Sequence, residues 1–373
     1  MKKFLAAVLC AAILCSLAAC GSNPGSLPDP DAESAPPASA SPTAEPSPTP
    51  APYTNPLTGE EIDEDISMYR PFGVMINNLP PSLPQRGVSQ AEILYEIPAE
   101  GGVTRMLALF TDISDIESIG TVRSIRPYYA QIAFGYDAII IHAGGSEAAY
   151  SLLSSTGWDH IDGVRETYAA APFARDPDRI HTGLEHSLFA DGAKLMEAID
   201  EKEFELEHDG GEYDYGLNFS KDAVEQCEGT AEYAQISFNT YKTMSFEYNA
   251  DDGLYYASQY GDAYIDENNG EQVSFTNLIF LETDISILDG YGRLEVRTTG
   301  EGTGWFCTGG KWVEITWERE DEYSPFHYYL ADGTELELGV GHTYVGIKGN
   351  DYGSGVSFTK EDWTCVNTLD KKS

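Results

Sequence analysis

Basic residues are scarce in this sequence of 373 residues. It holds 22 Lys and Arg against 61 Asp and Glu, which gives a formal net charge of −39. A surface of this sign repels phosphate backbones and anionic bilayers unless a local patch reverses it. General nucleic-acid binding is therefore excluded as a function class, and no nucleic-acid partner is expected.

The one apolar run near the start of the chain is too short to cross a bilayer, which takes about 20 apolar residues. It extends from Phe4 to Leu14, follows Lys2 and Lys3, and precedes the small residues of Leu17-Ala18-Ala19-Cys20. A charged start, a short apolar centre and a small-residue cleavage site are typical of a secretory signal. The sequence therefore predicts a signal peptide over residues 1–19.

The segment around Cys20 resembles the lipobox of bacterial lipoproteins. The resemblance implies cleavage before Cys20, acylation of its sulfur, and a membrane partner reached through this lipid anchor at the outer face of the plasma membrane. Two acyl chains are enough for stable anchoring. The alternative is an ordinary signal peptide in which Cys20 is incidental.

Cysteine is also rare. Of the six cysteines, two lie within the predicted signal and Cys20 would be acylated, which leaves Cys227, Cys307 and Cys365. In an oxidising compartment this odd number allows one disulfide and a free thiol, or three buried thiols. Their spacing matches no set of metal ligands, so neither a metal site nor a cofactor is expected.

Residues 20–52 contain no large apolar side chain beyond Leu27 and carry half of the twenty prolines. Such a segment cannot bury enough surface to offset the entropy of ordering it. It is predicted to be a disordered tether that carries the folded part away from the membrane.

Lysine is absent between Lys3 and Lys194, so every basic residue of this stretch is arginine. Arginine favours planar, bidentate recognition of carboxylate or phosphate. The alternative for each arginine is a plain ion pair with a neighbouring Asp or Glu. The arginines are Arg70, Arg86, Arg105, Arg123, Arg126, Arg165, Arg175 and Arg179.

The two halves of the folded sequence have different patterns. Residues 53–215 mix β-rich runs with segments of helical spacing, which predicts a mixed α/β N-terminal domain. Residues 225–366 alternate with period two and carry hairpin signals such as Asp252-Gly253 and Gly309-Gly310, which predicts a mainly antiparallel β domain. The fold class expected is α+β.

One segment predicts a binding site. Ser118–Val122, a helix over 125–134 and the strand Ala138–His142 would form a right-handed strand-helix-strand unit. Both strands would then end at one edge, where Arg123, Arg126 and the turn Gly144-Gly145-Ser146 could surround an anion. Ser146 could also cap a second helix that extends to about Ser154. His142 would be a neighbour that bonds or transfers a proton, or else a structural side chain.

Residues 163–186 form a polar connection that contains Arg179 and His181. It would act as a lid or specificity loop, or simply as a solvated link. The two histidines of this loop are five residues apart, so they do not share a helical face as zinc ligands would.

Several motifs together resemble the YerB family of bacterial lipoproteins. In the first half they are Arg70–Asn78, Pro84–Gly87, Ala91–Glu96, Glu100–Arg105, Val122–Tyr128 and His142–Ser146, and in the second Gly304-Trp305-Phe306, Gly309–Trp312 and Ile315-Thr316-Trp317. The resemblance covers nearly everything after residue 55.

The resemblance implies a layered sandwich of sheets and helices in the N-terminal domain, a lipid anchor, and an extracytoplasmic location in Gram-positive bacteria. It implies no established biochemical role. The family usually carries an Arg…Pro-His-Asn element in the lid region, whereas Arg179-Ile180-His181-Thr182 lacks the Pro and the Asn. This departure puts the specificity of the chain in question.

Three functions are compatible with these patterns. The first is a non-enzymatic lipoprotein that binds an anionic cell-wall ligand through Arg105, Arg123, Arg126 and the glycine turn. The second is a hydrolase or transferase of wall polymers in which Glu96 or Glu100 acts as acid or base with His142. The third is a scaffold for other envelope proteins.

Overall fold

The computed structural model describes residues 52–350 and 354–360. The predicted signal peptide, Cys20, nearly all of the tether and Cys365 lie outside the described residues. Within them the chain is mostly β-strand with three α-helices, and its sheets are largely antiparallel. None of these helices combines the length and the apolar composition that a membrane span requires.

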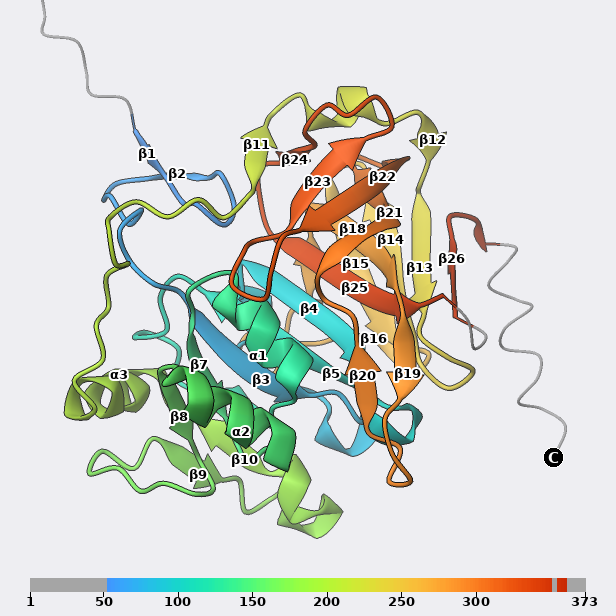
Figure 1. Cartoon of the computed structure of the whole chain (residues 1–373). Helices are drawn as coiled ribbons and strands as arrows, with labels where there is room; N and C mark the ends of the chain where they lie inside the picture. Colours follow the sequence, from blue (N-terminus) through green and yellow to red (C-terminus); the bar gives the residue numbers. More distant parts are fainter. Residues whose placement is uncertain (1–51, 351–353, 361–373) are drawn as a thin grey trace, which may run out of the picture. The chain divides into compact units, whose positions relative to one another are not determined.

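An eleven-stranded sheet runs through the molecule (Figure 1). Its order is β12 (Gly229–Thr230), β22 (Lys311–Arg319), β21 (Gly300–Thr308), β18 (Asn277–Thr283), β25 (Thr343–Gly349), β4 (Ile93–Pro98), β5 (Thr104–Phe110), β3 (Phe72–Asn77), β7 (Ile139–His142) and β8 (His160–Asp162), with β23 (His327–Leu330) paired to β22.

Strand β25 joins the two halves of the sequence into this sheet. It runs parallel to β18 on one side and to β4 on the other, with Thr343 opposite both Asn277 and Ile93. Strands from 53–215 and from 225–366 therefore share one continuous hydrogen-bonded sheet. The domain bounds inferred from composition stay a prediction.

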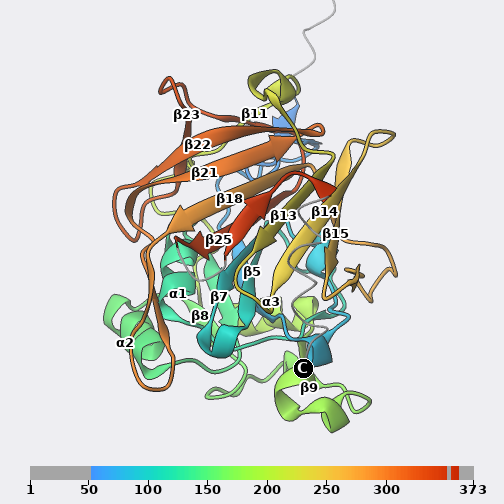
Figure 2. The ribbon, with the colours of Figure 1, turned by 90° about the vertical axis from the view of Figure 1, so that its right-hand side faces the viewer.

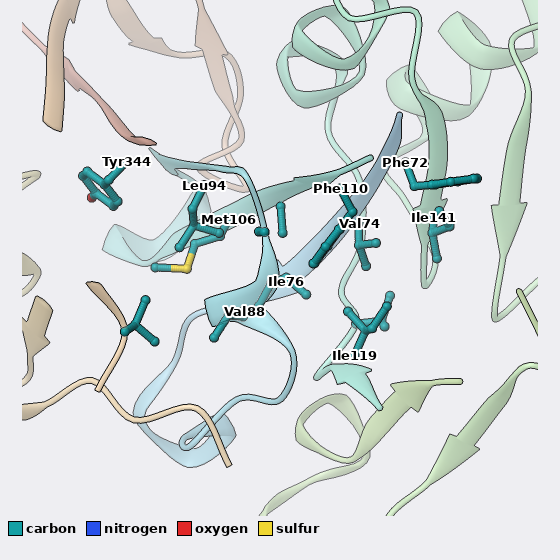
Figure 3. Close-up of a cluster of buried hydrophobic side chains, with 14 of the residues drawn as sticks. Phe72, Val74, Ile76, Val88, Leu94, Met106, Phe110, Ile119, Ile141 and Tyr344 are labelled. Atoms are coloured by element: carbon teal, nitrogen blue, oxygen red, sulfur yellow. The ribbon is translucent and has the colours of Figure 1, made fainter. Parts of the chain in front are cut away.

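Successive side chains along a strand point to opposite faces of the sheet, so they pack into two hydrophobic cores. On β5, Met106, Ala108 and Phe110 enter one core, while Leu107 and Leu109 enter the other. Figure 3 shows side chains of the first core, from β3, β4, β5 and β7, on one side of their strands. Burial on both faces explains why these strands read as nearly continuous apolar runs.

The first core is closed by a second sheet and by the helix α3 (Gly192–Glu201). Ile236, Met244 and Phe246 of the second sheet pack into this core with Leu195 of α3. The ribbon of this sheet and of α3 is seen in Figure 2. The second sheet consists of β16 (Asp262–Ala263), β15 (Leu254–Gln259), β14 (Thr243–Asn249), β13 (Tyr233–Ser237) and β26 (Gly355–Ser357), with β17 (Ser274–Phe275) paired to β15.

The second core is covered by helices α1 (Pro127–Phe134) and α2 (Glu147–Thr156). Smaller sheets lie around the two cores. In one of them, β10 (Leu188–Ala190) lies between β6 (Ile119–Gly120) and β9 (Phe173–Arg175). The others pair β1 (Tyr53–Thr54) with β2 (Glu61–Ile62), β11 (Asn218–Ser220) with β24 (Glu337–Gly339), and β19 (Ile285–Ile287) with β20 (Leu294–Val296).

The local signals of the sequence were read correctly in several places. Ser146 caps α2 by accepting a hydrogen bond from the Ala149 amide. Asp252-Gly253 lies between β14 and β15, and Gly309-Gly310 between β21 and β22. The finer prediction of a layered sandwich in the N-terminal domain stays a prediction.

The predicted strand-helix-strand unit is wrong. Its first strand, β6, pairs antiparallel with β10 in a separate small sheet and not beside β7. The parallel unit lies one step further along the chain, where β7 and β8 flank α2. The reason is that Val122 makes only an isolated bridge to Ile76 of β3, so this segment does not become a strand of the central sheet. The partner of β7 in that sheet is β3 instead.

Cys227 and Cys307 are both buried free thiols. Burial raises the pKa of Cys227 to about 11. A disulfide between these two residues is therefore not part of the fold, and the thiol form is stable at neutral pH.

We expect Gly304→Ala to destabilise the central sheet. A Cβ at Gly304 in β21 would lie 2.5 Å from the backbone oxygen of Phe280 in β18, so a strand must shift. Overpacking of this kind costs about 1–3 kcal/mol of unfolding free energy, measurable by urea denaturation. Gly290→Ala is the control, because nothing lies within 4 Å of its added methyl. Equal stability of the two variants would contradict the prediction.

Candidate functional site

A cavity of about 420 Å³ opens at the edge of the sheet where β7 and β8 end. These strands are parallel, with His142 opposite Asp162, so the segments that follow them lie together at one edge. The cavity is lined by Val122, Arg123, Ser124, Ala143, Gly144, Gly145, Tyr150, Val164, Arg165, Arg175, Leu184, Glu185 and Leu188.

The glycine turn after β7 forms one wall of the cavity. Gly144 has a φ of +77°, a conformation that L side chains rarely adopt. A Cβ on Gly145 would lie 3.0 Å from Ile125 and 3.2 Å from the Tyr150 ring, so glycine keeps this wall open. The amide of Gly145 donates to no hydrogen-bond acceptor in the described part of the chain.

Asp162 at the end of β8 holds this turn in place. Its Oδ1 accepts hydrogen bonds of 2.9 Å from the amides of Gly144 and Val164, and its Oδ2 accepts one of 2.6 Å from the Tyr150 hydroxyl. Burial raises the pKa of Asp162, but these hydrogen bonds outweigh it and the net pKa is lowered. Sequence reasoning missed Asp162. Its position at the end of a short β-rich run was the available signal.

Arg123 lies in the cavity wall on a backbone fixed from both sides. Its amide donates to the Met75 carbonyl at 2.8 Å, and its carbonyl accepts from the Ala143 amide at 3.0 Å. The side chain is half-buried, and burial together with the charge of Arg105 lowers its pKa. Among the described residues, the guanidinium of Arg123 has no hydrogen bond or ion pair.

Two further arginines line the same cavity, although sequence analysis assigned them no role in a site. Arg165 stacks on the Tyr150 ring, 3.4 Å from its centroid, and pairs with the exposed Glu147 at 2.9 Å. Arg175 donates to the carbonyl of Leu184 and, within the described residues, pairs with no carboxylate. Because both arginines are far from Arg123 in the sequence, their position in the same cavity could not be predicted from spacing.

One carboxylate, Glu185, also lines the cavity. A backbone hydrogen bond, together with the charges of His186, Arg123 and Arg175, lowers its pKa below the usual range against a small effect of burial. Glu185 is exposed, so its interaction with the arginines is screened by water. The residues that line the cavity thus include three arginines and one acid, Glu185.

Arg105 and Arg126, expected to join Arg123 around one anion, do not line this cavity. Both bind Glu100, Arg105 through a 3.0 Å contact and Arg126 through two nitrogens. Burial raises the pKa of Glu100, but the Arg126 hydrogen bond and the two positive charges lower it to about 2. Glu100 is thus a permanently ionised partner of two arginines, which does not suit a general acid.

His142 is fully buried at the end of β7 and does not line the cavity. Its Nδ1 lies 2.9 Å from the Gly144 carbonyl and must donate to it, because a carbonyl oxygen can only accept a hydrogen bond. Its Nε2 lies 3.1 Å from Nδ1 of His160. Burial lowers the pKa of His142 to about 4. His142 therefore supports the glycine turn as a neutral side chain.

Glu96 is completely buried in the centre of the sheet. It accepts hydrogen bonds from Asn78 at 2.8 Å, Thr104 at 2.5 Å and Tyr344 at 2.7 Å. Its charge is balanced by Lys242, whose Nζ lies 3.2 Å away and is itself buried. Glu96 does not line the cavity beside the glycine turn, and its contacts with Tyr344 and Lys242 join the two halves of the chain.

The remaining predicted residues lie elsewhere. Arg179 binds the carbonyl of Ser82 at 3.0 Å and the carboxylate of Glu267 at 2.6 Å, and Arg86 shares that carboxylate. His181 is exposed in a short 3-10 turn, and Ser146 serves as the cap of α2. The described residues contain no cluster of His, Cys, Asp and Glu that could hold a metal ion.

We expect His142 to make the fold sensitive to mild acid. Its pKa falls from 6.5 in the unfolded chain to about 4 in the folded one, so the unfolded state binds a proton first. This contribution to stability is complete above pH 6.5 and is lost as the pH falls towards 4, by about 3 kcal/mol in total.

The check is urea unfolding of the protein and of His142→Asn at pH 7 and pH 4.5. The variant should lose about 2–3 kcal/mol less between these two pH values, because it lacks the buried imidazole. His181→Asn, at an exposed position, is the control and should follow the parent. An unchanged pH slope in His142→Asn would show that the imidazole is not desolvated.

We expect Glu96→Gln to destabilise the protein by about 3–5 kcal/mol, because it leaves the Lys242 ammonium buried without a counter-charge. The double variant Glu96→Gln, Lys242→Met should recover much of the loss. Both values come from denaturant midpoints. If the single variant were as stable as the parent, Glu96 would be free for other chemistry and its structural role would be refuted.

Comparison with known proteins gives consistent matches over both halves. Two family models match, the N-terminal domain of the protein of unknown function DUF3048 at residues 57–205 and its C-terminal domain at residues 234–345. The putative lipoprotein YerB of Bacillus subtilis (strain 168) is 27% identical over 296 residues, which cover 78% of this chain and 85% of YerB.

The crystal structure of YerB from Bacillus subtilis is similar to this structure with a TM-score of 0.69 at 26% identity, covering 82% of this chain and 99% of the YerB chain. Sequence and fold thus agree across both halves. The chain belongs to the YerB-like family of lipoproteins built from the DUF3048 N-terminal and C-terminal domains.

Proposed function

We propose that this protein is a lipoprotein, anchored through Cys20 at the outer face of the plasma membrane, that binds an anionic ligand of the cell envelope without transforming it. Similarity to a putative lipoprotein supports the anchor. The ligand would occupy the cavity beside Gly144 and Gly145.

The observation that carries this proposal is the guanidinium of Arg123. It is half-buried in the cavity wall and, within the described residues, forms no close ion pair, since the exposed Glu185 acts on it only at longer range. A partly desolvated positive charge without a partner costs free energy that a bound anion would recover. Arg175 offers a second guanidinium to the same space.

The pocket suits binding better than hydrolysis. Glu96 and Glu100 each form ion pairs with basic side chains, and His142 lies behind the glycine turn. A general acid or base must reach the reacting atom, directly or through one water. Glu185 lines the cavity and could accept a proton, but a backbone hydrogen bond and its basic neighbours lower its pKa and so make it a weak base.

Isothermal titration with inorganic phosphate and with an acetylated dipeptide carboxylate tests this proposal. We expect Arg123→Ala to weaken binding of the preferred anion by about tenfold or more, since a charge-assisted hydrogen bond contributes about 1.5–3 kcal/mol. Arg123→Ala, Arg175→Ala should remove measurable binding.

Arg293→Ala is the matched control. It removes the same charge from the hairpin of β19 and β20, where Arg293 pairs with Asp289 at 2.5 Å. Its affinity should equal that of the parent. Equal weakening by Arg293→Ala would mean that only net charge matters, and unchanged affinity in Arg123→Ala would refute the proposed site.

A further inference from the structure

The wall of the same cavity carries apolar side chains that water reaches. Val164 and Leu184 are 59% and 56% exposed, and both line the cavity. They come from segments twenty residues apart, one directly after β8 and the other in a 3-10 turn before β10. Exposed Val and Leu at one concave site are a feature of ligand and partner surfaces.

Apolar surface continues from these residues towards the floor of the cavity. Val122, Ala143 and Leu188 are buried side chains that line it as well. The arginines occupy the remaining wall, with Arg123 beside Ser124 and the glycine turn. The cavity therefore combines an apolar strip with a basic region.

We propose that the ligand is an anionic amphiphile with a phosphate head group and an alkyl chain, which deepens and rests on the proposed function. The head group would pair with Arg123 and Arg175, and one of its oxygens would accept a hydrogen bond from the free amide of Gly145. The chain would cover Val164 and Leu184. A small hydrated anion satisfies the arginines but leaves both apolar side chains in water.

Phosphate fits this basic region better than a lone carboxylate. Arg123, Arg175 and the Gly145 amide supply donors from three separate segments, and a phosphate presents three oxygens that can accept hydrogen bonds from different directions. The negative field of a chain with net charge −39 repels a dianion except where positive charges are concentrated, as they are here.

The test is calorimetric titration of the soluble part of the chain, residues 21–373, with ethyl, butyl and octyl phosphate below the concentration at which octyl phosphate forms micelles. Burial of a methylene stabilises a complex by up to about 0.8 kcal/mol, or about fourfold in Kd. With the chain partly buried, we expect octyl phosphate to bind at least about tenfold tighter than ethyl phosphate.

Two variants locate the effect. Val164→Ser, Leu184→Ser should lose most of the gain in affinity from ethyl to octyl phosphate. Ile180→Ser is the control, because Ile180 is an exposed apolar residue of the same loop that does not line the cavity. It should retain the full dependence on chain length.

The possible outcomes distinguish a failure of the amphiphile proposal from a failure of the proposed anion-binding function. If Arg123→Ala weakens every probe but ethyl and octyl phosphate bind equally, the anion site stands and the amphiphile is refuted. If octanoate binds as tightly as octyl phosphate, the phosphate head group is refuted. If Arg123→Ala changes no affinity, both the ligand class and the proposed function fail.

Discussion

The parallel pairing of β25 with β4 is the constraint on which the rest of the structure depends. It places a strand from near the C-terminus beside one from the first hundred residues, and so makes one sheet of two chemically different halves. Glu96 and Lys242 lie at this junction as a buried ion pair. Such a pair adds little stability over an apolar pair, but removal of either partner is costly, so it selects this pairing against others.

The same junction leaves the carboxyl ends of β3, β7 and β8 free at one edge, because these strands run parallel. Loops that follow the parallel strands β7 and β8 meet there, which is how residues 143–145 and 164–165 come to line one cavity. Residues 122–124 reach the same cavity from the small sheet of β6, because the backbone of Arg123 bonds to Met75 and Ala143. Asp162 and His142 fix the glycine turn from behind. The rigid part of the site is thus buried and the arginines lie on its exposed side.

Local sequence signals were sufficient to predict individual helices and hairpins, but not which strands pair with each other in a sheet. The cap at Ser146 and the hairpin at Asp252-Gly253 depend on a few adjacent residues, and both were predicted from sequence. The partner of β7 depends on competition among several β-rich runs. Sequence alone offered Ser118–Val122, whereas Phe72–Asn77 took the place because its side chains fill both cores.

Composition and local order determined the acidic character of this protein, the predicted anchor and tether, the strand and turn positions, and the arginine-only stretch with its glycine turn. Only the tertiary structure decided which arginines are free. Arg105 and Arg126 are neutralised by Glu100, and Arg165 and Arg175 reach the cavity of Arg123 from distant positions. The physical reason is that an ion pair is a matter of a few ångströms in space, which spacing along the chain does not encode.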